Sequence, residues 1–101
     1  MEKLYLMAKG HTRRFPNGND PFQITTRIRE ECGEVASEVN RFEKSGVKVE
    51  KHGCASKKDL ANEIRQAINC LIQLAQYYGC EQELEDAIDY SIERLKNDGA
   101  L

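Results

Sequence analysis

Apolar residues recur at helical spacing in several separate segments of the chain. In the longest segment they recur close to the helical period, at Phe22, Ile24, Ile28, Cys32, Val35, Val39 and Phe42. Asp20 is placed to cap this segment, Pro21 suits a first helical position, and Gln23 completes the spacing of a capping box. The pattern therefore predicts a helix over Pro21–Glu43.

A second long helix is predicted to begin after Ser56, which is a cap residue with Asp59 three positions later. Gly79 is suited to end this helix. Its apolar residues are Leu60, Ile64, Ala67, Ile68, Leu71, Ile72, Leu74, Ala75 and Tyr78. This apolar surface is wider than one neighbouring helix would cover. We therefore expect a second copy of the chain to complete the packing.

Two shorter helices are expected to flank this pair. One extends from Met1 to about His11, and a loop over Thr12–Asn19 follows it. The other covers Glu81–Asn97, with its apolar residues at Leu84, Ile88, Ile92 and Leu95. The segment 44–56 breaks the helical pattern, and no segment has the alternation of a strand. We expect one all-α domain over residues 1–101, a bundle of four helices completed by oligomerisation.

Composition excludes several classes of protein. The formal net charge of −2 argues against a dedicated nucleic-acid-binding protein, and no apolar run is long enough to span a membrane. The four cysteines form no C-x-x-C pair, and His52 with Cys54 is only half of a zinc site. Met1–Gly10 lacks the apolar core of a signal peptide. We expect a reduced cytoplasmic protein.

Acidic residues lie on one face of the longest predicted helix. Glu31, Glu34 and Glu38 follow one another at i, i+3 and i+7, beside the stripe of apolar residues. Their mutual repulsion is unfavourable unless a cation lies between them. A solvated acidic face is the alternative interpretation.

The next long helix carries Glu63 and Gln66 one turn apart. If the two helices pack antiparallel, these side chains face Glu31 and Glu34. Carboxylate and amide oxygens are hard ligands, which favour Mg²⁺ or Mn²⁺. Five lysines between positions 44 and 58 suggest a polyphosphate substrate.

These residues resemble a known family. The motif E-E-x-x-E at Glu30, Glu31 and Glu34, followed by an E-x-x-D-like spacing at Glu63 and Gln66, resembles the MazG-like all-α nucleoside triphosphate pyrophosphohydrolases. The resemblance covers about Phe15 to Gly79. It implies hydrolysis of (deoxy)nucleoside triphosphates to a monophosphate and pyrophosphate, with Mg²⁺ as cofactor. It also implies a homo-dimer or homo-tetramer.

The resemblance implies a role for each acid. Glu31, Glu34 and Glu63 would be metal ligands, together with Gln66, which stands where the family has Asp. Glu30 would orient the metal site or its water, and Glu38 would help to hold a second metal or position the attacking water.

Basic and aromatic residues are candidates for substrate binding. Lys57 and Lys58 lie at a helix start, where cations are unfavourable, and this marks them as candidate phosphate contacts together with Arg14. The alternative is that all three are solvated surface residues. Phe15, Phe22 and Tyr78 could stack on a base or pack in the core.

Gln66 removes one negative charge from the family's ligand set. Two alternative functions therefore stay open. One is a degenerate, non-catalytic MazG-like bundle that binds nucleotide or a protein partner. The other is a structural oligomerisation module whose acids are only a solvated face.

Overall fold

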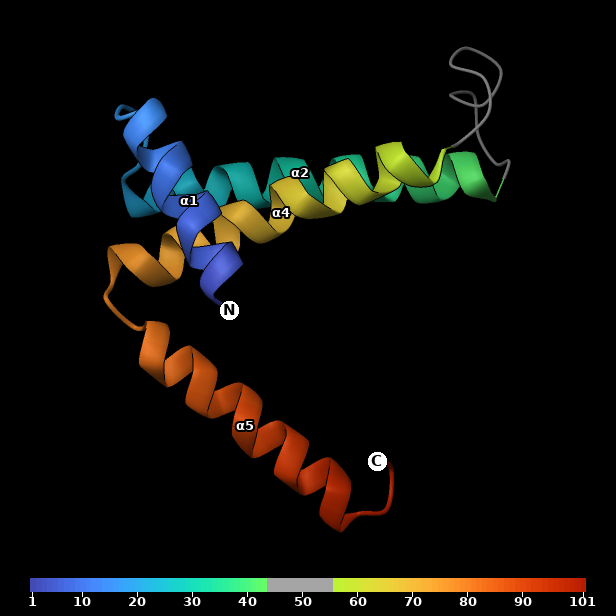
Figure 1. The fold of residues 1–101 in the computed structure, drawn as a ribbon. Helices are drawn as coiled ribbons and strands as arrows, with labels where there is room; N and C mark the ends of the chain where they lie inside the picture. Colours follow the sequence, from blue (N-terminus) through green and yellow to red (C-terminus); the bar gives the residue numbers. More distant parts are fainter. Residues whose placement is uncertain (44–55) are drawn as a thin grey trace.

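The computed structural model describes residues 1–43 and 56–101, which form α-helices and no strand within these ranges. The helices are α1 (Glu2–Arg14), α2 (Pro21–Phe42), α4 (Lys57–Tyr77) and α5 (Glu81–Asn97) (Figure 1). The expected all-α fold with four helices is confirmed for the described residues. The expected loop at 44–56, apart from Ser56, and the pair His52 and Cys54 lie outside them.

Helices α2 and α4 form the centre of the fold. They lie side by side and run in opposite directions, so the expected antiparallel packing is confirmed (Figure 1). Helix α4 contacts both α2 and α1, and the buried apolar residues come from all three helices: Ile24 of α2, Ala8 of α1, and Cys70, Ile72 and Ala75 of α4. The α2–α4 pair is therefore the scaffold on which the candidate site residues are placed.

The predicted helix ends are present in the structure. The Gln23 backbone N–H donates to Asp20 Oδ1 at 2.8 Å, and the Asp20 N–H donates to Gln23 Oε1 at 3.2 Å, which together form the capping box. The Asp59 N–H donates to Ser56 Oγ at 3.0 Å. Gly79 ends α4 with a φ of +63°, in the left-handed region that glycine adopts without strain.

Helix α1 extends to Arg14, about three residues beyond its expected end at His11. The reason is local, because Arg13 and Arg14 lie in its last turn, where positive charge stabilises the negative end of the helix. The Phe15 N–H also continues the helical pattern by donating to the His11 carbonyl oxygen at 2.9 Å. The loop before α2 is correspondingly shorter than expected.

Helix α5 diverges from the rest of the molecule (Figure 1). It contacts α4 and has no buried residue. The Tyr5 hydroxyl of α1 is 3.0 Å from Glu85 Oε2 and donates a hydrogen bond to it. None of the described helices is both long and apolar enough to cross a membrane.

Candidate functional site

Four carboxylates meet where α2 faces α4, and we call them the acidic groove: Glu31, Glu34 and Glu38 from α2 and Glu63 from α4. Glu31, Glu38 and Glu63 each have a buried Oε2 atom with no hydrogen-bond partner. A buried carboxylate oxygen without a partner is unfavourable by about 1–3 kcal/mol or more. The groove thus holds acceptor oxygens that the chain itself leaves unsatisfied.

Glu63 lies in a negative electrostatic environment created by the neighbouring carboxylates. Burial raises the pKa of its carboxyl group, and the charges of Glu34, Glu31 and Glu38 raise it further, with a smaller contribution from Asp59. Glu38 is buried, and its Oε1 accepts an ion pair from Arg41 Nη1 at 2.8 Å. The arrangement favours a cation beside Glu63.

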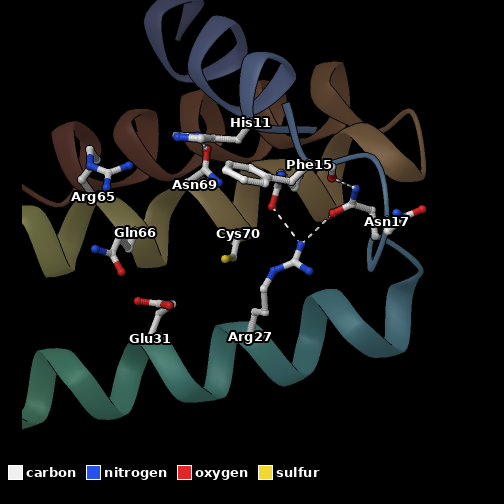
Figure 2. A pocket seen from close by; sticks show the side chains of 11 residues that line it. His11, Phe15, Asn17, Arg27, Glu31, Arg65, Gln66, Asn69 and Cys70 are labelled. Atoms are coloured by element: carbon white, nitrogen blue, oxygen red, sulfur yellow. Dashed lines mark hydrogen bonds between the residues drawn. The ribbon is translucent and has the colours of Figure 1, made fainter. Parts of the chain in front are cut away.

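A polar pocket of about 320 Å³ adjoins the acidic groove (Figure 2). Glu31 of α2 and Gln66 of α4 line it, and Figure 2 shows their side chains pointing toward each other. Cys70, a free and buried thiol, also lines the pocket. The remaining lining residues come from α1, the following loop, α2 and α4: His11, Phe15, Asn17, Asn19, Arg27, Arg65, Asn69 and Gln73.

Arg27 holds the loop after α1 against α4. Its Nη2 donates to Asn19 Oδ1 at 3.0 Å and to Gln73 Oε1 at 3.2 Å, and its Nη1 donates to the Gly18 carbonyl oxygen. The Asn19 amide in turn donates to the Phe15 carbonyl oxygen at 2.7 Å. These bonds fix one wall of the pocket and leave Arg27 partly buried inside it.

His11 is oriented by the buried Asn69. The distance between His11 Nδ1 and Asn69 Oδ1 is 2.8 Å, and because an amide oxygen only accepts, Nδ1 carries the proton in this arrangement. Nε2 of the neutral ring is then an acceptor. The Phe15 ring is 62% exposed and carries the Arg14 guanidinium 5.8 Å from its centroid. The pocket therefore offers both polar groups and an accessible aromatic face.

Of the residues expected to bind metal, Glu31 and Gln66 line the pocket, and Glu63 lies within electrostatic reach of Glu31 and Glu34, whereas Glu34 is itself exposed on α2. Glu30 is exposed on α2 and is not among the residues that line the pocket. Lys57 and Lys58 are exposed in the first turn of α4, and Arg14 is exposed in the last turn of α1. These three cations lie on the surface as candidate phosphate contacts.

Sequence reasoning did not identify His11, Arg27 or Asn19 as site residues. One signal was available for Arg27, because it precedes Glu31 by four positions and therefore shares its helix face. No comparable signal exists for His11, which reaches the pocket only because α1 packs on α4.

The donor set matches Mg²⁺ in the type of its ligand atoms but not in their present positions. Unsatisfied carboxylate oxygens on Glu31 and Glu63 are the hard ligands that Mg²⁺ requires. Among the described residues, however, no three Asp, Glu, His or Cys side chains converge closely enough to hold one ion. The carboxylate oxygens are therefore of the type that binds Mg²⁺, but the glutamate side chains would have to rotate before three of them could contact one ion.

Comparisons of the chain with protein-family models, with curated proteins and with solved structures found no match.

Proposed function

We propose that the chain is a Mg²⁺-dependent nucleotide pyrophosphohydrolase, which cleaves (deoxy)nucleoside triphosphates to a monophosphate and pyrophosphate. The observation that carries the proposal is Glu63: its buried Oε2 has no partner, and three carboxylates of α2 raise its pKa further. Such a carboxylate is stabilised by a divalent cation. The resemblance to the MazG-like family rests on the same residues.

In this proposal Glu31, Glu34, Glu63 and the Gln66 amide oxygen hold Mg²⁺, with Mn²⁺ as a substitute. When bound, the ion supplies charge neutralisation for the phosphates. Glu38 positions the attacking water, and its ion pair with Arg41 fixes its orientation. Glu30, exposed beside Glu31, orients the surrounding water.

The pocket beside the groove is where a nucleoside would lie. Phe15 offers an exposed ring on which a base can stack. Lys57 and Lys58 begin α4 six and five residues before Glu63, about 9 and about 7.5 Å along the helix axis, where they can contact a phosphate chain. Arg14, whose guanidinium lies 5.8 Å from the centroid of the Phe15 ring, is the candidate phosphate contact on the α1 side of the pocket. A homo-dimer or homo-tetramer in the cytoplasm belongs to this proposal, and the described free thiols of Cys32, Cys70 and Cys80 are in keeping with it.

A degenerate bundle that binds nucleotide or a protein partner without turnover is the second candidate. Two observations favour it: Gln66 carries no charge, and no three acidic side chains converge among the described residues. Nucleotide binding and nucleotide hydrolysis both require an intact pocket, and hydrolysis requires the metal as well.

The test is release of pyrophosphate and monophosphate from a panel of nucleoside triphosphates, with Mg²⁺ and with EDTA. We expect metal-dependent release by the parent chain and its loss in Glu63→Gln. Glu83→Gln, which neutralises an exposed acid on α5, is the matched control and should keep activity. Nucleotide binding without release would establish the second candidate. Neither binding nor release across the panel would overturn both.

A further inference from the structure

Helix α5 has an apolar face that residues 1–43 and 56–101 leave largely open. Leu84, Ile88, Ile92 and Leu95 share one face at helical spacing, and the last three are 39%, 39% and 42% exposed. A 17-residue amphipathic helix is only marginally stable in water without a partner for this face. Among the described helices, α4 packs against α5, and α1 reaches it through the hydrogen bond from Tyr5 to Glu85.

The same helix has an acidic edge. Glu81, Glu85, Asp89 and Glu93 follow one another at four-residue spacing beside the apolar row. Glu85 accepts a hydrogen bond from Tyr5 of its own chain, whereas Asp89 and Glu93 are exposed. Like charges at this spacing repel by about 0.2–0.5 kcal/mol for each pair. The partner that covers the apolar face is therefore expected to present positive charge along one side.

Such a surface exists elsewhere on the chain. A second pocket of about 420 Å³ lies between α1, the start of α2 and α4, with apolar walls formed by Pro16, Ile24 and Tyr77. Lys9 and Arg13 of α1 are at its rim, and none of the described residues lining it is an acid. An apolar hollow edged by two cations is complementary to an apolar row edged by acids.

We propose that this chain self-associates by placing the apolar face of α5 on the basic-rimmed pocket of a second copy. In the proposed pair a twofold axis relates the two copies, so each α5 face lies on the other copy's pocket and the contact is made twice. Doubling the contact brings two modest patches toward the 1,200–2,000 Å² or so of a stable interface. The interface lies outside the acidic groove and does not depend on whether the chain hydrolyses nucleotides.

The test is light scattering of the full chain at micromolar concentration, with two pairs of variants. Ile88→Asp and Arg13→Glu alter the two halves of the proposed contact. Tyr90→Asp on the opposite side of α5 and Arg29→Glu on α2 are the matched controls, and all four positions are exposed. We expect an assembly of at least two chains for the parent and both controls, and dissociation of Ile88→Asp and Arg13→Glu with helical circular dichroism retained.

A monomeric parent would overturn the proposal, and so would full association of either Ile88→Asp or Arg13→Glu. If Ile88→Asp loses its helical signal, Ile88→Ala replaces it, because it removes apolar contact without adding charge. The expected result is then an increase of at least about tenfold in the dissociation constant. An unchanged constant for Ile88→Ala would contradict the contact.

Discussion

At the scale of single residues, Gln66 determines how much charge the site carries. It lines the pocket opposite Glu31 and supplies one neutral amide oxygen where the resembling family has a carboxylate. Because the amide leaves the divalent ion less fully neutralised, the residue is expected to limit metal affinity.

We therefore predict that Gln66→Asp binds Mg²⁺ more tightly than the parent. The added charge attracts the ion, and in its absence repulsion from Glu31 lowers the free energy of unfolding. Isothermal titration calorimetry measures the affinity, with Gln82→Asp on exposed α5 as the control for added charge alone. An affinity equal to the parent's would show that position 66 does not face the ion.

Glu63 predicts a pH dependence in the metal-free protein. Its pKa is raised in the folded state, so ionisation is less favourable there than in the unfolded chain. The folded state is destabilised by the full amount when the pH is above the raised pKa. This destabilisation disappears as the pH falls below the pKa that the carboxyl group has in the unfolded chain. In EDTA we expect Glu63→Gln to melt at a higher temperature than the parent at neutral pH.

The difference in melting temperature should shrink toward zero below about pH 4, where the unfolded carboxyl group is also protonated. Glu83→Gln is the control, because its side chain is exposed on α5. A melting difference that does not change with pH would point to altered packing instead of ionisation.

At the scale of elements, helix ends were predictable because their signals are local. Asp20, Pro21 and Gln23 determine the start of α2 within four positions, and Gly79 determines the end of α4. The orientation of α5 was not predictable, since it depends on tertiary contacts such as the hydrogen bond from Tyr5 to Glu85, 80 positions away.

Gly33 illustrates the same limit within α2. A glycine inside a helix fits either a close approach by a backbone or ligand or a tolerated local cost, and a Cβ atom built at Gly33 meets nothing within 4 Å among the described residues, which favours the tolerated cost. The acids of α2 in the groove were predictable from the sequence, because their spacing along a single helix places them on one face. His11 and Asn19 escaped notice because distant segments bring them to the pocket.

The cap of α2 supports a prediction about the whole element. Asp20→Ala removes the side-chain acceptor of the Gln23 N–H and should destabilise the protein by about 1 kcal/mol. For a domain of this size that corresponds to a decrease of roughly 4–8 °C in melting temperature. Thermal denaturation followed by circular dichroism measures it, and Asp20→Asn, which keeps an acceptor oxygen, should lose much less.

At the scale of the whole molecule, an ion that binds only the native state should stabilise it by mass action. We expect millimolar Mg²⁺ or Mn²⁺ to raise the melting temperature of the parent and to leave that of Glu34→Gln nearly unchanged. Glu83→Gln should respond as the parent does. If the parent melts at the same temperature with and without the ions, the acidic groove is a solvated face.

The buried thiol of Cys70 makes the polar pocket observable by chemistry. Cys70 is 5% exposed and lines the pocket, whereas Cys32 is exposed on α2. A thiol alkylating reagent should therefore label Cys32 quickly and Cys70 slowly, at a rate set by how often the pocket opens. A nucleotide bound in the pocket would slow the labelling of Cys70 and leave the labelling of Cys32 unchanged. The ratio of the two labelling rates, measured by mass spectrometry, therefore reports how much of the pocket is occupied, without any measurement of turnover.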